Sequence, residues 1–300
     1  MTTHWTADLD RIAFSFDIGS KSFEVAWYGI ILTCAMVIAL IVSIYRGKKY
    51  GLSSESFVEL FIICIPLAII GARLGFVLIR PYYFSSWEGL KDIFNLKEGG
   101  LTIMTGVPFG FLGGYIWCKA KKVDFWALAD IVLPVVLLAQ GLGRWGNFMN
   151  QEIYGKLITN PKAQWFPLAV YIPFGKQGSG FYQAAFFYEM VLDILFFAII
   201  LIIQKRLRLK GSGILMYAIG YSFIRFLMDF TRDGGPSVDS VVRANLIFTA
   251  ISTIILSVIF AYRLISAQKN GEIIWYPKGV PENLKIMINY NITEEEAKNM

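Results

Sequence analysis

The densest group of reactive side chains lies in residues 143–155, which read Gly-Arg-Trp-Gly-Asn-Phe-Met-Asn-Gln-Glu-Ile-Tyr-Gly. Arg144, Asn147 and Glu152 supply a cation, an amide and a carboxylate within nine positions. The glycines permit close backbone approach and unusual dihedral angles. An ordinary polar loop would not include so many large apolar residues. The segment therefore predicts a binding or catalytic site at the end of the apolar stretch that precedes it.

A second set of polar side chains recurs every four residues: Tyr217, Tyr221, Arg225 and Asp229, with Arg232 one turn further. On a helix this spacing places them on one face. Arg225 can pair locally with Asp229, which would make the set structural. Two phenols and two arginines in one stripe are more typical of a lined pocket, and the planar guanidinium group suits phosphate oxygens. The stripe therefore indicates a phosphate-bearing ligand, such as a phospholipid head group.

Six charged residues fall inside long apolar stretches: Arg73, Asp130, Glu189, Asp193, Arg225 and Asp229. In a membrane-spanning helix each would cost about 2.5–3.5 kcal/mol to insert. We therefore expect them to face the interior of a helix bundle, where each is a candidate functional residue. The alternative is that they form ion pairs that only hold helices together.

A glycine-rich segment over residues 99–106 reads Gly-Gly-Leu-Thr-Ile-Met-Thr-Gly, and Gly110, Gly113 and Gly114 follow it. Glycines at such spacing are typical of a closely packed helix. They are equally compatible with non-helical backbone that lines a cavity, which membranes tolerate only where protein or water covers it. The sequence leaves both alternatives open.

The elements that must position these residues are membrane helices. Of 300 residues, 56% are hydrophobic and 17% are charged, and the mean hydropathy is +0.54. Soluble domains average about 45–50% apolar and about 25% charged residues. The net charge of +6 comes from short basic clusters between apolar runs. This distribution argues against a nucleic-acid-binding face and is typical of the cytoplasmic loops of membrane proteins.

Seven stretches are predicted to span the membrane: residues 25–45, 57–79, 103–118, 125–142, 181–203, 213–230 and 244–265. Basic clusters follow the first, third and fifth spans. Because short basic loops stay cytoplasmic, we expect the N-terminus outside and the C-terminus inside. We therefore predict an all-α integral membrane protein, with a seven-helix transmembrane domain over residues 1–265 and a polar cytoplasmic tail over residues 266–300.

Cysteine and histidine are too sparse for several kinds of site. Cys34, Cys64 and Cys118 lie in apolar runs without metal-binding spacing, and His4 is the only histidine. Buried cysteines usually act as small apolar residues. A Ser-His pair and a histidine-rich metal site are therefore excluded. We expect neither a metal nor a cofactor.

Residues 143–155 are similar to the signature of the prolipoprotein diacylglyceryl transferase family, Gly-Arg-x-Gly-Asn-Phe-x-Asn-x-Glu-x-x-Gly. Further stretches resemble the family in the same order: Trp27-Tyr28-Gly29, Gly71-Ala72-Arg73-Leu74-Gly75, Phe187-Tyr188-Glu189, and Tyr221 through Arg225 to Asp229. The resemblance covers residues 14–265 and leaves out the tail.

The resemblance implies a seven-helix, multi-pass enzyme of the bacterial plasma membrane. Such an enzyme moves the diacylglyceryl group of phosphatidylglycerol to the lipobox cysteine of a preprolipoprotein and releases glycerol phosphate. By motif position, Arg144 and Arg225 would hold the phosphate, and we expect Glu152 to accept any proton. The resemblance and the polar stripe together place these residues in the substrate site: Tyr28, Arg73, Asn147, Gly155, Glu189, Tyr221, Asp229 and Arg232. The expected partners are phosphatidylglycerol, signal peptides with a lipobox cysteine and membrane lipids, and not nucleic acid.

One position departs from the family pattern. Where the family has Gly-Gly-x-x-x-His-Gly-Gly, this chain has Met104 in place of the histidine and Thr105 in place of a glycine. A thioether cannot take a proton, so a histidine base is excluded at this position. We therefore expect the substrate's thiolate to attack the glycerol carbon bonded to phosphate, while Arg144 and Arg225 stabilise the leaving phosphate.

Two other functions compete with this interpretation. A transporter or channel would use Arg73, Glu189 and Asp229 as an ion path, but it should contain internal repeats, and none is visible. A catalytically inactive relative would bind phospholipid or lipoprotein precursor without reaction. Such a relative would have no need to keep both Arg144 and Arg225.

Overall fold

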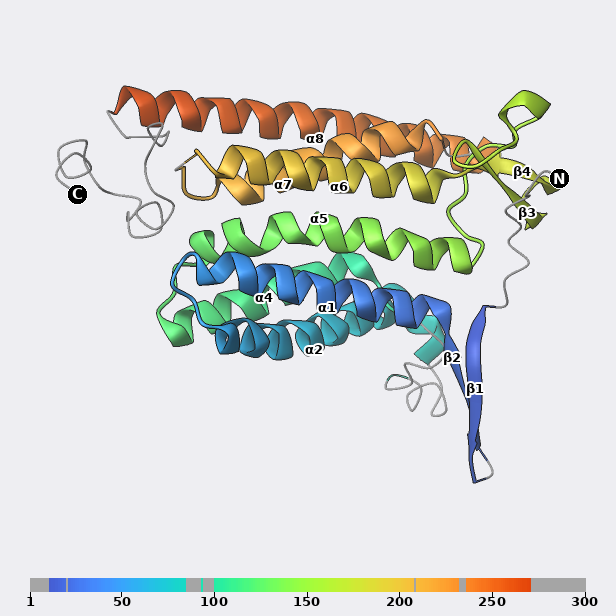
Figure 1. The fold of residues 1–300 in the computed structure, drawn as a ribbon, viewed down its shortest axis with the longest axis horizontal. Coiled ribbons are helices and arrows are strands. Elements are labelled where there is room, and N and C mark those ends of the chain that lie inside the picture. Colours follow the sequence, from blue (N-terminus) through green and yellow to red (C-terminus); the bar gives the residue numbers. More distant parts are fainter. Residues whose placement is uncertain are drawn as a thin grey trace. The chain divides into compact units, whose positions relative to one another are not determined.

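The computed structural model describes residues 11–19, 21–84, 93, 100–207, 209–231 and 236–270. The chain forms two compact units, one of Met1–Val42 with Ala129–Met300 and one of Ser43–Leu128. Within the described residues, seven long helices lie at the seven predicted spans (Figure 1). They are α1 (Trp27–Lys48), α2 (Ser54–Ile79), α4 (Ile103–Lys121), α5 (Phe125–Met149), α6 (Ala185–Gln204), α7 (Ser212–Asp229) and α8 (Pro236–Lys269).

Five of these helices are long and apolar enough to cross a membrane. They are α1, α2, α5, α6 and the part of α8 over Ala244–Lys269, with mean hydropathy between 1.9 and 2.5. Helices α4 and α7 are shorter and fall outside this group because glycine or polar side chains lower their hydropathy. The fold is therefore that of a helical membrane protein in which five helices meet the requirements of a span.

Two β-hairpins are an addition to the predicted all-α fold. Strands β1 (Ile12–Ile18) and β2 (Lys21–Ala26) pair antiparallel, as do β3 (Ala169–Gly175) and β4 (Gly178–Gln183). They correct two predicted boundaries, because β2 takes the start of the first predicted span and β4 takes the start of the fifth. An apolar run that continues from a strand into a helix does not reveal the boundary by its periodicity. A short 3-10 helix, η1 (Pro81–Phe84), follows α2, and another, η2 (Pro161–Ala163), precedes β3.

Helix α5 is longer than predicted, and this changes where the signature segment lies. The predicted span ended at residue 142, but the helix continues to Met149, and the Asn150 amide still donates to the Gly146 carbonyl at 3.1 Å. Beyond its end at Met149, Gln151 and Ile153 have left-handed φ angles of 54° and 56°, which turn the chain away from the helix axis. Arg144 and Asn147 therefore stand on α5 itself, and not beyond its end.

In the unit of Ser43–Leu128, α4 packs closely against α2 through small residues. A Cβ atom at Gly106 would lie 3.1 Å from the Ala68 carbonyl oxygen, and one at Gly71 or Gly75 would overlap Phe109 or Thr105. Such close approach is typical of small residues between membrane helices. From Ile103 onward, the glycine-rich segment is therefore a packed helix, and non-helical backbone is excluded there.

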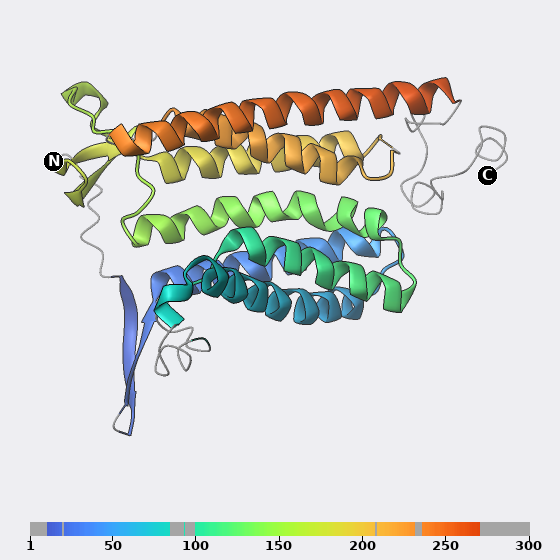
Figure 2. The same cartoon turned by 180° about the vertical axis from the view of Figure 1, so that it is seen from behind.

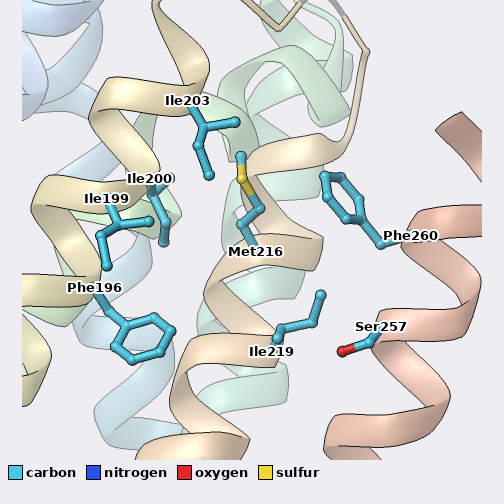
Figure 3. A pocket seen from close by; sticks show the side chains of 8 residues that line it. All are labelled: Phe196, Ile199, Ile200, Ile203, Met216, Ile219, Ser257 and Phe260. Atoms are coloured by element: carbon cyan, nitrogen blue, oxygen red, sulfur yellow. The ribbon is translucent and has the colours of Figure 1, made fainter.

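In the other unit, α6, α7 and α8 lie side by side, as both views of the ribbon show (Figures 1 and 2). Their apolar faces line an open pocket of about 240 Å³, formed by Phe196, Ile199, Ile200, Ile203, Met216, Ile219, Ser257 and Phe260 (Figure 3). The lining has a single hydroxyl group and no charged side chain. This pocket suits hydrocarbon but offers no group for acid–base or anion chemistry.

Asp130 joins the start of α7 to α5. Its two carboxylate oxygens accept hydrogen bonds from the backbone N–H groups of Gly211 and Gly213, each at 2.7 Å. Gln204 at the end of α6 donates to the Asp130 carbonyl at 3.0 Å. The first N–H groups of a helix have no partner within the helix and carry partial positive charge, so a carboxylate suits this place. For Asp130 the structure favours the structural alternative raised by the sequence.

Candidate active site

Two arginines from different helices meet at one carboxylate oxygen. Arg144 Nη2 on α5 donates to Glu189 Oε1 on α6 at 2.6 Å, and Arg225 Nη1 on α7 donates to the same oxygen at 3.2 Å. These three residues form the arginine cluster. Because both nitrogens reach one oxygen, the two guanidinium groups are close enough to bind a single anionic group together.

The arginine cluster is shielded from solvent. The Glu189 side chain is 2% exposed, and those of Arg144 and Arg225 are 17% and 16% exposed. Asp229, four residues after Arg225 on α7, is also buried and places its Oδ1 3.8 Å from Arg225 Nη2. Electrostatic interactions are stronger at such a low-dielectric site than in water.

The arginine cluster retains unused hydrogen-bonding capacity. Within the described part of the chain, Arg144 Nε and Glu189 Oε2 are buried and have no hydrogen-bond partner. An unmet buried donor costs roughly 1–3 kcal/mol. An incoming anion that accepts a hydrogen bond from Arg144 Nε would remove that cost.

A chain of hydrogen bonds extends the arginine cluster into the turn after α5. Arg144 Nη1 donates to Asn147 Oδ1 at 3.4 Å, and Asn147 Nδ2 donates to Glu152 Oε1 at 2.9 Å. Asn150 Nδ2 donates to the same Glu152 oxygen at 3.3 Å. Glu152 is exposed and this oxygen is already shared by two amides. Its contacts hold the Asn147 side chain in one orientation, and Asn147 in turn orients Arg144.

Gly155 ends this turn where there is no room for a side chain. Its N–H donates to the Gln183 carbonyl at 2.9 Å. A Cβ atom would lie 2.7 Å from Gln183 Cβ and 3.0 Å from the Thr231 carbonyl oxygen. The glycine therefore lets the turn dock against the end of β4 and the residues that follow α7. The predicted role of Gly155 in the substrate site thus has a packing explanation.

Two tyrosines predicted for the substrate site lie near these helices. The Tyr28 ring at the start of α1 covers Gly146, where a Cβ atom would lie 2.8 Å from Tyr28 Cδ2. Tyr221 stacks on Tyr217 with ring centroids 6.2 Å apart and is 37% exposed. Tyr28 on α1 thus lies against the helix that carries the signature, and Tyr221 lies on the helix that carries the stripe.

The other predicted substrate-site residues lie elsewhere or cannot be placed. Arg73 is in the unit of Ser43–Leu128, where it donates to the backbone carbonyls of Ile93 at 2.7 Å and Gly100 at 3.0 Å. It therefore supports the segment that leads into α4. Met104, at the family's histidine position, is 80% exposed. Arg232 lies outside the described residues, as do His4 and residues 271–300.

From the sequence, Asp193 was one of six charged candidates without a specific role, and Gln140 was not a candidate. Gln140 lies four residues before Arg144, and Asp193 lies four residues after Glu189. The available signal was this helical spacing, which puts each on the same face as a member of the arginine cluster. Asp193 is 2% exposed. These two residues extend the polar interior toward the middle of the helices.

The two converging guanidinium groups make the site suited to binding an anion. Two guanidinium groups that converge in a shielded place can bind a phosphate and stabilise charge that develops on it. The amide and carboxylate chain fixes one of these groups in position. Such an arrangement is suited to a displacement in which a phosphate leaves.

Comparison with known proteins agrees with this chemistry. The sequence model of the family described as prolipoprotein diacylglyceryl transferase matches residues 13–265. The chain is 38% identical over 259 residues to phosphatidylglycerol–prolipoprotein diacylglyceryl transferase 1 of Clostridium perfringens, covering 85% of this chain and 95% of that protein. It is 32% identical over 256 residues to the Clostridium botulinum protein of that activity, covering 85% and 98%. It is 29% identical over 285 residues to the Limosilactobacillus reuteri protein, covering 92% and 98%.

Proposed function

Because this chain belongs to the prolipoprotein diacylglyceryl transferase family, we infer that it transfers the diacylglyceryl group of phosphatidylglycerol to prolipoproteins. The acceptor is the thiol of the lipobox cysteine in the signal peptide. The reaction forms a thioether and releases glycerol phosphate. The protein acts as a multi-pass enzyme of the bacterial plasma membrane, where both substrates reside.

One observation supports the assignment of the phosphate site above all others. Arg144 and Arg225 come from separate helices and reach the same oxygen of Glu189. A carboxylate oxygen is a stand-in for a phosphate oxygen, since both are anionic acceptors of guanidinium hydrogen bonds. We place the lipid phosphate beside Glu189, with Arg144 Nε as one of its donors.

The reaction is a displacement at carbon. The sulfur forms a bond to the glycerol carbon that carries the phosphate, and the bond between that carbon and the phosphate oxygen breaks. The electron pair stays on the departing glycerol phosphate, where both arginines stabilise the added charge. Asn147 and Glu152 act on this step by holding Arg144 in place.

Three of the remaining predicted residues lie beside this site. Tyr28 covers the helix at Gly146, Tyr221 extends the α7 stripe, and Asp229 balances the charge of Arg225. Arg73 acts in the Ser43–Leu128 unit by holding the segment before α4. We also propose Arg232 as a substrate-binding residue.

The proposed topology has seven spans, with the N-terminus outside and the C-terminus in the cytoplasm. It adds α4 and α7 to the five helices that meet the requirements by themselves. The basic residues of the turns after α1, α4 and α6 then all face the cytoplasm. The part of the signature that follows α5, residues 150–155, faces the outer surface of the membrane. The polar residues after α8 form a cytoplasmic tail to a transmembrane catalytic domain.

An assay with purified protein tests this function. The protein is placed in vesicles that contain phosphatidylglycerol, together with a peptide that carries a lipobox cysteine. We expect a peptide whose mass has increased by one diacylglyceryl group, and release of glycerol phosphate. Vesicles with phosphatidylcholine as the only lipid serve as the control. Binding of the lipid without any modified peptide would instead identify an inactive relative.

A further inference from the structure

A second polar layer lies one helical turn inside the arginine cluster. It has members on the same three helices, displaced by about four residues toward their middles: Gln140 on α5, Asp193 on α6 and Tyr221 on α7, with Tyr217 one turn further. Four residues of an α-helix correspond to about 6 Å. We call these four residues the inner polar layer.

Asp193 is the charged member of the inner polar layer. Its side chain packs against the backbone of α5, since a Cβ atom at Gly141 would lie 3.0 Å from Asp193 Cβ. The residue is 2% exposed, and within the described residues its Oδ2 atom is buried without a hydrogen-bond partner. The ionisable groups within its electrostatic reach are Glu189 on its own helix, Arg144 on α5, and Arg225 and Tyr217 on α7.

Gln140 adds a second acceptor to this layer. Its Nε2 donates to the Tyr217 hydroxyl at 3.3 Å, while its Oε1 is buried without a partner among the described residues. Buried acceptors without donors cost roughly 1–3 kcal/mol each. The inner polar layer therefore has a shortage of hydrogen-bond donors, which a substrate group that carries a proton would relieve.

The geometry of a phospholipid places the reacting atoms at this layer. When the phosphate lies at Arg144 and Arg225, the acyl chains extend toward the middle of the bilayer. The glycerol carbon to be attacked therefore lies on the inner side of the phosphate. The sulfur must approach that carbon from the face opposite to the leaving oxygen. This approach places the sulfur further from the phosphate, toward the middle of the bilayer. The thiol thus loses its proton in the region of the inner polar layer.

We propose that Asp193 accepts the proton of the substrate's thiol, an inference that rests on the proposed function. The S–H proton passes to Asp193 Oδ2 as the sulfur forms its bond to the glycerol carbon. The bond between that carbon and the phosphate oxygen breaks, and its electrons stay on the glycerol phosphate. Asp193 then gives the proton to the departing phosphate. In this chain Asp193 is a catalytic residue.

Charge balance favours this transfer over the arrival of a free thiolate. A neutral thiol that gives its proton to a neighbouring carboxylate leaves the net charge of the site unchanged. A thiolate would add one negative charge beside Glu189 and Asp193, at a place where repulsion is weakly screened. Glu152 is a poorer acceptor because it is exposed and its Oε1 already binds Asn147 and Asn150.

The variant Asp193→Asn tests the proposal, because it keeps the shape of the side chain and removes its basicity. We expect turnover of the lipobox peptide to fall about 10²–10⁴-fold, with KM for phosphatidylglycerol within a factor of three. Turnover of this variant should then rise about tenfold per pH unit below about pH 8.5, the usual pKa of a cysteine thiol. The parent protein should depend less on pH in that range.

A peptide with selenocysteine in place of the lipobox cysteine separates proton acceptance from positioning. A selenol is already ionised at neutral pH and needs no base. We therefore expect Asp193→Asn to lose less than tenfold with this peptide. Glu152→Gln is the matched control, and its loss should be the same with both peptides because Glu152 acts by orienting Asn147.

Two outcomes would overturn the proposal: full activity of Asp193→Asn, or an equal loss with both peptides. If Asp193→Asn does not fold, Asp193→Glu replaces it. That variant displaces the carboxylate by one methylene, and its loss must also be smaller with the selenocysteine peptide. Failure of the parent protein to modify either peptide would instead reject the proposed function, so the two failures can be told apart.

Discussion

Arg144 and Arg225 are separated by 81 positions in the chain and bind the same oxygen of Glu189, at 2.6 and 3.2 Å. Helices α5 and α7 each bring one of them to Glu189 on α6. The two guanidinium groups are therefore already close enough to bind one anion together. Under the proposed function, this arrangement would receive the lipid phosphate without a large rearrangement of the two side chains.

The first prediction concerns the guanidinium group itself. Arg144→Lys keeps the charge but removes the planar fork that contacts Glu189 and Asn147. We expect turnover to fall about 10²–10³-fold, as for the loss of one donor to a developing anion. Arg206→Lys is the matched control, because Arg206 lies exposed in the turn after α6. Equal activity of both variants in the vesicle assay would show that the guanidinium group of Arg144 is not needed to bind the phosphate.

A second prediction concerns the buried carboxylate of the arginine cluster. Glu189→Gln leaves two buried guanidinium groups without their shared anion. Removing one partner of a buried ion pair costs about 3–5 kcal/mol, and we expect a loss of this size in the free energy of unfolding in detergent. An added anionic lipid should restore part of the stability. A melting temperature equal to that of the parent would show that the carboxylate is not needed to hold the arginines.

The third prediction separates Asp130 from the chemistry. Asp130→Asn can satisfy only one of the two N–H groups of Gly211 and Gly213 as an acceptor. We expect a loss of about 1–3 kcal/mol in stability and faster amide hydrogen exchange at residues 211–215. Turnover by the folded fraction should stay within a factor of three of the parent. Lys162→Ala, at an exposed position in η2, is the control for both measurements. A large fall in turnover with unchanged exchange would contradict the structural role.

The proposed topology can be tested by labelling of single cysteines in intact cells. The background carries alanine in place of Cys34, Cys64 and Cys118. A membrane-impermeant maleimide should label Ser179→Cys, on the exposed β3–β4 hairpin, from outside. Arg206→Cys should be labelled only after the membrane is opened. Labelling of both from the same side would reject an odd number of spans between them.

The positions of the helices were predictable, because long apolar runs are a property of the local sequence. The residues at which the helices begin and end were less predictable. The signature residues Arg144 and Asn147 were expected beyond a span that ended at residue 142, and they lie on α5, because helical hydrogen bonding continues through the glycines of the segment. The two hairpins were missed because their apolar residues merge with those of the next helix.

The sequence by itself determined the family and the membrane character, and it predicted Arg144 and Arg225 as site residues, because each of these depends on residue types at short spacing. It also gave Arg225 a local partner in Asp229, four residues away, and this contact is present at 3.8 Å. It did not reveal that Glu189 accepts hydrogen bonds from both arginines, or that Asp193 is buried one helical turn further along α6. Spacing on one helix tells which residues share a face, but the partner opposite that face depends on how separate helices pack. Only the tertiary structure decides that packing, because it arises from contacts between residues far apart in the chain.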